Sequence, residues 1–143
     1  MSTHIRSLAA AAFVILPACQ GTPSSPPVSN MVIGVIDAGE IVDSALSGPT
    51  NGAVGEPLVF SITTFGGGCY RPAGAQVINQ GLQMTVIPYD SVLPGPCTRD
   101  LRALPREVVI VFDRSGNAVL RLQGRSYTGR SPVVVTRQMQ IRP

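Results

Sequence analysis

Few side chains in this sequence can do chemistry, and the cysteines are the most informative of them. There are three, Cys19, Cys69 and Cys97, beside a single histidine, His4, and eleven basic residues that are all arginine. The chain after residue 18 therefore has neither an imidazole nor an ε-amine. Catalysis by Ser-His-Asp, Cys-His or Ser-Lys arrangements, and Schiff-base chemistry, is excluded there.

Paired carboxylates are the remaining catalytic candidates, as in glycosidases and aspartic proteases. Asp37, Glu40 and Asp43 lie close in sequence, but no signature of either enzyme class surrounds them. These residues, or the alternating oxygen donors of 113–117, could bind calcium, although a calcium site takes about six to eight oxygens with several carboxylates. We interpret the first group as a solvated loop and 113–117 as a tight turn. We expect no enzymatic activity, no metal and no cofactor.

Cys69 and Cys97 predict a disulfide, because two thiols of a small domain in an oxidising compartment most simply pair with each other. Closing that loop contributes about 3 to 4 kcal/mol in the chain-entropy account. A redox pair would need a C-x-x-C spacing, and zinc would need two further N or S ligands. Both cysteines lie in Gly/Pro-rich stretches, 66–72 and 94–99, which we expect at one end of the domain. Loops held in this way often carry recognition, although the bridge could instead only compensate for an aromatic-poor core.

The arginines give the only hint of a binding surface. In an extended strand, Arg121 and Arg125 lie on the face opposite Leu120 and Leu122. Because guanidinium groups bind carboxylates and phosphates in bidentate fashion, an anionic glycan, a lipid headgroup or an acidic envelope protein is a candidate partner. A solvated charged face is the alternative, and a net charge of +3 is too small to indicate nucleic-acid binding. The candidate binding residues are Tyr70, Arg71, Arg99, Arg102, Arg121 and Arg125, and Arg106 continues the group after Cys97.

Cys19 ends an N-terminal segment with a pattern of its own. Basic residues near the start precede an apolar run over 8–15, and small residues follow, as in a secretory signal peptide. Leu16-Pro17-Ala18-Cys19 resembles a bacterial lipobox, which implies cleavage before the cysteine and attachment of diacylglycerol to its sulfur. A plain cleaved signal is the alternative, whereas a membrane span would need about 20 apolar residues.

Residues 19–30 predict a flexible tether between the anchor and a domain over 31–143. The segment is rich in Pro and Ser and holds no large apolar residue except Val28, so it buries too little surface to order itself. Gln20 follows the cysteine. By similarity to the sorting rule of enteric bacteria, this implies the outer membrane, with the domain facing the periplasm or the cell surface.

The sequence of the domain predicts short strands separated by turn residues, and it has no segment with the period of a helix. Alternation of apolar and polar residues is clearest over 58–62. Two hairpins are expected, with turns at 79–81 and 113–117. The seven apolar runs are 31–36, 58–65, 76–78, 82–87, 108–112, 118–122 and 133–141.

This pattern is similar to the immunoglobulin-like domains of bacterial envelope lipoproteins, over residues 31–143. The resemblance implies an all-β, antiparallel sandwich of about seven strands with one disulfide, after a signal peptide (1–18) and a flexible tether (19–30). The absence of tryptophan excludes the variable-domain subtype. The implied function is a non-enzymatic, lipid-anchored module that binds or positions another envelope component. The alternative is a ligand-binding or inhibitory domain, whose disulfide-tied loops recognise a glycan, a small molecule or, through 69–72, a protease.

Overall fold

The computed structural model describes residues 30–39, 45–129 and 131–143. Every regular element in these ranges is a β-strand, which confirms the predicted all-β fold. Within them, no helix has the length and hydropathy needed to cross a bilayer. The lipobox, the signal peptide and residues 19–29 of the tether lie outside the described residues. The strands are β1 (Asn30–Ile33), β2 (Val35–Asp37), β3 (Leu46–Ser47), β4 (Asn51–Ala53), β5 (Leu58–Gly66), β6 (Tyr70–Gln80), β7 (Gln83–Val92), β8 (Arg102–Ile110), β9 (Gly116–Ser126) and β10 (Pro132–Arg142).

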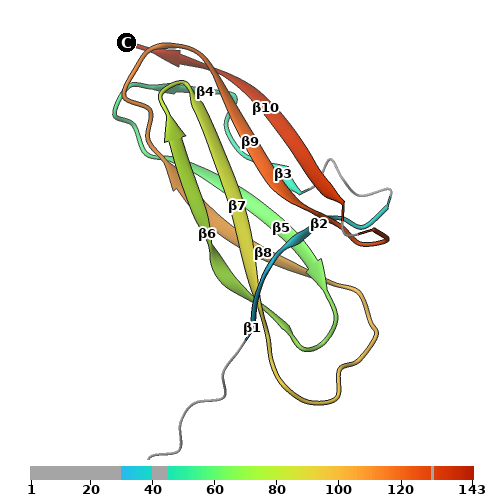
Figure 1. Cartoon of the computed structure of the whole chain (residues 1–143). Helices are drawn as coiled ribbons and strands as arrows, with labels where there is room; N and C mark the ends of the chain where they lie inside the picture. Colours follow the sequence, from blue (N-terminus) through green and yellow to red (C-terminus); the bar gives the residue numbers. More distant parts are fainter. Residues whose placement is uncertain (1–29, 40–44, 130) are drawn as a thin grey trace, which may run out of the picture.

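The strands pack in two layers, as in a β-sandwich (Figure 1). One layer runs β6–β7–β9–β10, with the short strand β4 at the edge of β10. The other pairs β5 with β8 and with the short strand β3. Three long antiparallel ladders, β6–β7, β9–β10 and β5–β8, account for most of the strand pairing, and two of them belong to the first layer.

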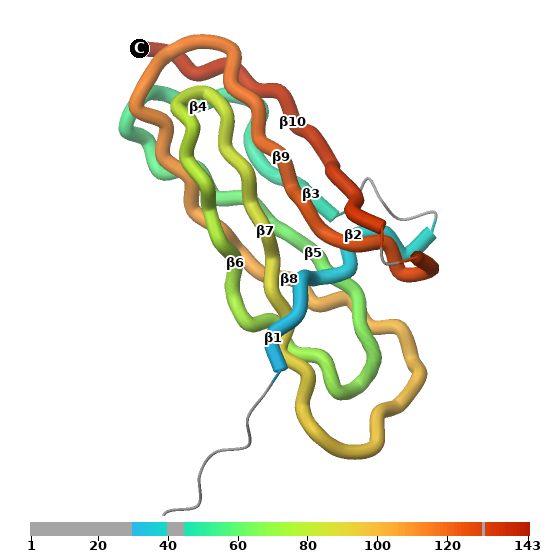
Figure 2. The backbone as a smooth tube through the Cα atoms, in the orientation of Figure 1, coloured from blue at the N-terminus to red at the C-terminus, as the bar shows by residue number. Residues whose placement is uncertain are grey.

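The first apolar run, predicted as one strand over 31–36, is divided at Gly34 into β1 and β2. β1 pairs with β7, whereas β2 continues between β9 and β5 and so connects the layers (Figure 2). A Cβ at Gly34 would lie 2.4 Å from Thr64 Cγ2, so only glycine fits at the point where the chain passes from β1 to β2. The pairs β2–β9, β7–β9 and β4–β10 are parallel. The sheet is therefore mixed, where we expected an antiparallel one, because crossovers bring strands distant in sequence side by side.

One predicted hairpin is confirmed and the other is wrong. β6 and β7 pair around Gly81, whose φ is +77°, and Asn79 Oδ1 accepts a hydrogen bond from Gly81 N at 2.8 Å. Residues 113–117 instead carry the chain from β8 in one layer to β9 in the other, and β9 forms its hairpin with β10. Alternating hydrophobicity identifies the side chains that face the core, but it does not identify the neighbouring strand.

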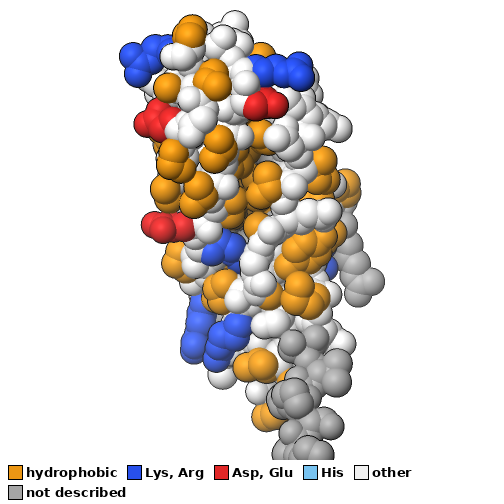
Figure 3. All heavy atoms as spheres, turned by 90° about the vertical axis from the view of Figure 1, so that its left-hand side faces the viewer, with side chains coloured by type: hydrophobic (Ala, Val, Ile, Leu, Met, Phe, Trp, Pro, Cys, Tyr) orange, Lys and Arg blue, Asp and Glu red, His pale blue; other side chains and the backbone are white. Residues whose placement is uncertain are grey.

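The core lies between the layers and is mostly aliphatic, with two phenylalanines, Phe60 and Phe112. Alternate residues of β5, β7 and β9 point inward, as the pattern over 58–62 predicts. Hydrophobic side chains also reach the surface on the side shown in Figure 3. The buried core residues are Ile36, Ala45, Leu46, Leu58, Phe60, Ile62, Met84, Val86, Ile110, Phe112, Ala118, Leu120, Leu122, Met139 and Ile141.

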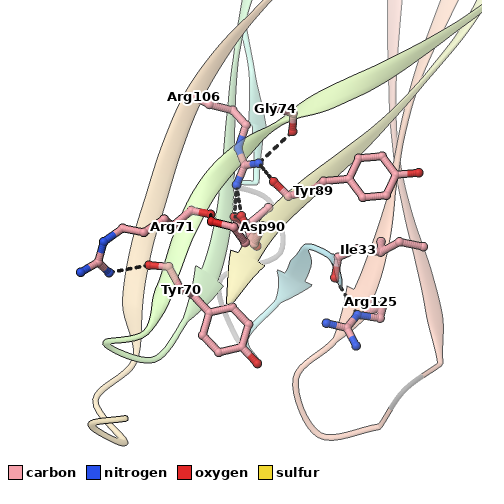
Figure 4. A network of polar contacts seen from close by, with 10 residues as sticks. Ile33, Tyr70, Arg71, Gly74, Tyr89, Asp90, Arg106 and Arg125 are labelled. Atoms are coloured by element: carbon pink, nitrogen blue, oxygen red, sulfur yellow. Dashed lines mark hydrogen bonds and ion pairs between the residues drawn. The ribbon is translucent and has the colours of Figure 1, made fainter. Parts of the chain in front are cut away.

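Towards the end of the sandwich where β1 begins, the interior also holds polar side chains. Thr64 on β5 and Asp90 on β7 are fully buried, and Arg106 on β8 contacts both. The Arg106 guanidinium forms an ion pair with Asp90 and donates to Thr64 Oγ1. It also donates to the carbonyls of Gly74, at 3.0 Å, and Tyr89 (Figure 4). One side chain thus joins β5, β6, β7 and β8.

This burial corrects the prediction for Arg106, which placed it in the exposed arginine group after Cys97. Its side chain is only 8% exposed and its charge is already paired. The reason is strand alternation, because Leu104, Arg106 and Val108 share the inward face of β8.

We predict that Arg106→Ala destabilises the fold by about 3 to 5 kcal/mol, because it leaves the Asp90 charge buried without a partner. Arg102→Ala is the control, since its ion pair with Asp100 is about half exposed and exposed pairs contribute about 0 to 1 kcal/mol. Urea denaturation of both variants measures the difference. Equal destabilisation would mean that the buried ion pair does not hold the layers together.

Candidate functional site

The described residues form an open cleft of about 540 Å³ at the end of the sandwich where β1 begins. One wall comes from the turn between β5 and β6 and from the loop between β7 and β8. The other comes from the end of β9 and the residues that follow it. The course of these segments can be followed in Figure 1. The lining side chains with the most potential for recognition are Phe65, Tyr70, Arg99, Asp100, Arg125 and Tyr127.

A disulfide fixes the first wall. Cys69 and Cys97 are bonded, with an S–S distance of 2.02 Å, which confirms the predicted bridge and places both loops at one end of the domain. Hydrogen bonds from Gly68 N to Thr98 O (3.3 Å) and from Leu93 N to Cys69 O (3.0 Å) join the same two segments. Because Cys97 itself lines the cleft, the bridge holds the wall directly.

Three consecutive glycines allow these segments to approach each other. A Cβ on Gly66 would lie 2.6 Å from the Tyr70 ring, and one on Gly67 would lie 2.7 Å from Thr98 O. A Cβ on Gly68 would lie 2.1 Å from Thr98 Oγ1. A Cβ atom essentially never lies within 3.0 Å of a non-bonded heavy atom. The glycine run therefore permits the Tyr70 ring to lie over the turn and the Thr98 segment to pack against it.

Tyr70 and Arg99, two of the predicted binding residues, line the cleft, and Arg125 reaches it from the opposite wall. Arg125 Nε donates to Ile33 O at 2.7 Å, which holds the guanidinium at the end of β9 (Figure 4). Arg121 and Arg125 lie on the outward face of β9, opposite Leu120 and Leu122, as strand alternation predicts. Only Arg125 lines the cleft, because β9 ends there, whereas the exposed Arg121 lies where β9 runs between β7 and β10.

Two other predicted binding residues, Arg71 and Arg102, support the cleft rather than line it. Arg71 Nη1 donates to the carbonyls of Gly68 (2.8 Å) and Tyr70 (2.7 Å), so it braces the turn between β5 and β6. Arg102 Nε donates to Asp100 Oδ2 and forms an ion pair with it. Both arginines therefore position residues that face the cleft.

The cleft carries two arginines that pair with no carboxylate of the described residues. Among the described residues, Arg99 and Arg125 form no ion pair. The terminal nitrogens of Arg125 donate to no described group. Asp100, the carboxylate in the lining, already accepts hydrogen bonds from the Thr98 hydroxyl and from Arg102, which hold its pKa below the ordinary value. An anion in the cleft would meet free guanidinium donors.

Phe65 and Tyr127 complete the cleft, and neither is among the predicted binding residues. Phe65 ends the predicted strand 58–65, where an aromatic side chain indicates core rather than a site. Tyr127 follows β9 and is 57% exposed. Its backbone N donates to Asp37 O at 2.9 Å, so its position is fixed although its ring is accessible. The signal that could have identified Tyr127 is an aromatic residue at the start of a turn that joins two strands.

The carboxylates weighed as calcium ligands give no such site in the described residues. Asp37 Oδ1 accepts a hydrogen bond from Gly39 N at 2.9 Å, as in a local turn, while Glu40 and Asp43 lie outside the described ranges. Asp113 is 63% exposed at the connection between β8 and β9. In the ranges with assigned structure, no three His, Cys, Asp or Glu side chains gather as a metal site.

Guanidinium groups beside aromatic rings suit a ligand that combines an anionic group with a flat or apolar part. A phosphorylated or carboxylated sugar and a lipid headgroup both meet this description. No family model, no curated protein and no solved structure matches the chain. The cleft and the sequence motifs are therefore the basis for a functional hypothesis.

We predict that the Asp100 carboxyl titrates below its ordinary pKa of 3.8, first because Thr98 donates a hydrogen bond to it and second because Arg102 does. A lowered pKa means that this group stabilises the loop above about pH 4 and that the contribution is lost as the pH falls through the folded-state pKa. Carbon-13 NMR of the side-chain carboxyl measures the titration. Thr98→Val should return the pKa towards 3.8, and an unchanged value in that variant would contradict the assignment.

Proposed function

We propose that this chain is a non-enzymatic, lipid-anchored protein of the bacterial cell envelope whose β-sandwich binds an anionic envelope component. The cleft at the disulfide end is the proposed recognition site. One observation carries the proposal: Arg99 and Arg125 face a common cleft, without a described ion-pair partner, beside the accessible rings of Tyr70 and Tyr127. Rigid walls favour binding, because little conformational entropy is then lost when a ligand orders its contacts.

The anchor rests on the residues around Cys19, which lie outside the described ranges. Because Leu16-Pro17-Ala18-Cys19 resembles a lipobox, we propose that the cysteine is lipidated. Because Gln20 follows it, we propose the outer membrane as the location. The disulfide between Cys69 and Cys97 supports a location outside the cytosol, since disulfides persist in oxidising compartments. A lipid anchor of several acyl chains holds a protein at a membrane durably, whereas one chain is marginal.

The inhibitory alternative receives less support from the geometry. An inhibitor of a protease presents an exposed, rigid loop, and 69–72 was the candidate for one. Tyr70, Arg71 and Pro72 instead begin β6 and pair with Val92, Ser91 and Asp90 of β7. We therefore place recognition in the cleft, to which Tyr70 contributes, and do not propose 69–72 as an inhibitory loop.

We predict that the mature protein begins at Cys19 and carries acyl chains on it. Intact-mass spectrometry of protein purified from the bacterial membrane should give a mass above that of the unmodified chain from Cys19. Cys19→Ser should abolish the added mass and release the protein from the membrane fraction. A product that begins at Cys19 without acyl mass would exclude the anchor.

We predict that a photo-crosslinking residue at Tyr127 captures an envelope component in living cells. A photo-crosslinker is needed because the chain has no lysine, so amine-reactive reagents have no side chain to attack. The matched control is Val109, which is equally exposed, at 57%, but lies on β8 away from the cleft. Mass spectrometry of the adducts should find a specific product at Tyr127, which Arg125→Gln weakens. Equal products at both positions would argue against the cleft as the site.

A further inference from the structure

We infer that the disulfide end of the sandwich docks on an anionic membrane surface, and that the cleft takes the phosphate of a lipid headgroup. The inference rests on the proposed function, because it names the partner of the same cleft. The surface in question, the docking end, comprises the cleft together with Met31, Leu93 and Leu101 around it. Three features of this end support a membrane over a soluble ligand.

The first feature is the point at which the chain enters the domain. Asn30 pairs with Val92, which also pairs with Tyr70 at the cleft wall. Leu93, the next residue, donates through its backbone N to Cys69 O at 3.0 Å. β1 therefore begins beside the disulfide. Figure 1 shows the start of β1 at the lower end of the molecule. A lipid on Cys19 would be joined to the docking end itself.

The length of the intervening chain limits how far the docking end can lie from the anchor. Residues 19–29 can span at most about 40 Å when fully extended, at roughly 3.5 Å per residue. The strands β9 and β10 have 11 residues each, and at about 3.3 Å per residue they hold the far end some 35 Å farther away. Of the two ends, the docking end is the one that the tether keeps near the bilayer.

The second feature is exposed hydrophobic side chains beside the cleft arginines; others, such as Val59 and Val109 on the β5–β8 pair, lie away from the cleft. Met31 is 59% exposed, Leu93 38%, Leu101 45% and Tyr127 57%. A soluble anion would not explain apolar residues on β1 and at both ends of the β7–β8 loop. A membrane interface does, because it accepts apolar and aromatic side chains at the depth of the headgroups.

The third feature is the charge that accompanies these residues. Arg99 and Arg125 lack a described ion-pair partner, and guanidinium groups match phosphate oxygens in bidentate geometry. On the face in Figure 3, basic side chains gather towards the lower end without acidic ones, whereas both signs appear at the upper end. Arginine and apolar side chains side by side match a membrane surface, because anionic headgroups attract the arginines and the interface accepts the apolar side chains.

Single tryptophans test this arrangement cleanly, because the chain has none of its own. Leu101→Trp reports on the docking end and Val111→Trp on the far end, and the two sites are matched at 45% and 46% exposure. Each lipidated full-length protein is reconstituted in phosphatidylcholine vesicles with and without phosphatidylglycerol, using lipids brominated on the acyl chains. In the anionic vesicles we expect bromine quenching at Leu101→Trp to exceed that at Val111→Trp at least about threefold, as insertion of a side chain to the acyl boundary requires.

The role of the arginines is tested in the Leu101→Trp background. Arg99→Gln with Arg125→Gln should reduce the quenching to the far-end value, and 1 M NaCl should do the same, since it shortens the Debye length to about 3 Å. Arg121→Gln with Arg142→Gln, two exposed arginines that do not line the cleft, is the matched control and should leave quenching unchanged. Unaltered urea midpoints in both double variants exclude unfolding as the cause.

Other outcomes separate this inference from the proposed function. Equal quenching at Leu101→Trp and Val111→Trp, in protein whose acylation is verified by mass, overturns docking but leaves the anchor in place. A soluble inositol phosphate that changes the Leu101→Trp emission while vesicles do not quench it assigns the cleft to a free phosphate and also overturns docking. A protein or glycan adduct at Tyr127 without quenching supports the proposed function with another partner. Absence of acyl chains on Cys19 overturns both proposals.

Discussion

The buried ion pair between Arg106 and Asp90 is the interaction on which the functional end of this sandwich depends. The main aliphatic core fills the other part of the interior. At the functional end, Thr64, Asp90 and Arg106 are buried beside Phe65 and Leu104. Arg106 bonds to groups on β5, β6 and β7, so it fixes the distance between the layers beyond the main core. A single guanidinium can do this because it has five donors in a planar array and stays charged when buried.

The cleft is the consequence of that arrangement at the surface. Its two walls belong to segments far apart in the sequence, and each is held independently. The disulfide and the glycine run fix the wall that carries Tyr70 and Arg99. The N-terminal segment fixes the other, since Ile33 O and Asp37 O bond to Arg125 and to the backbone of Tyr127. Exposed side chains on such a frame keep their relative positions, and this pre-organisation is what a binding site requires.

Much of the fold was predictable, because strands with one buried face leave a period of two in the sequence. Each of the seven predicted runs overlaps at least one strand. The pairing of two cysteines followed from their number and context. The partners of each strand were not predictable. The turn residues at 113–117 look the same whether the chain returns along its own layer or crosses to the other. The inward orientation of Arg106 was hidden for a related reason, since a charged residue in a strand normally indicates the outer face. Arg125 lines the cleft because β9 ends there, and the sequence does not show where β9 ends relative to the other strands. The strands β3 and β4 are too short to give a recognisable pattern of alternation.

The way in which the N-terminal segment enters the sandwich has a mechanical consequence. If the chain is held at its N-terminus, any pull is transmitted through Asn30 along the axis of β1. That strand is laid against β7, and β2 continues the same segment between β9 and β5. A force along the strand loads these hydrogen bonds together, in shear, instead of opening them one at a time. The neighbouring turn is also stapled covalently to the loop that follows β7. A pull on the N-terminal segment is thus met in shear by the β1–β7 ladder, beside the disulfide, before it reaches the long ladders of the sandwich.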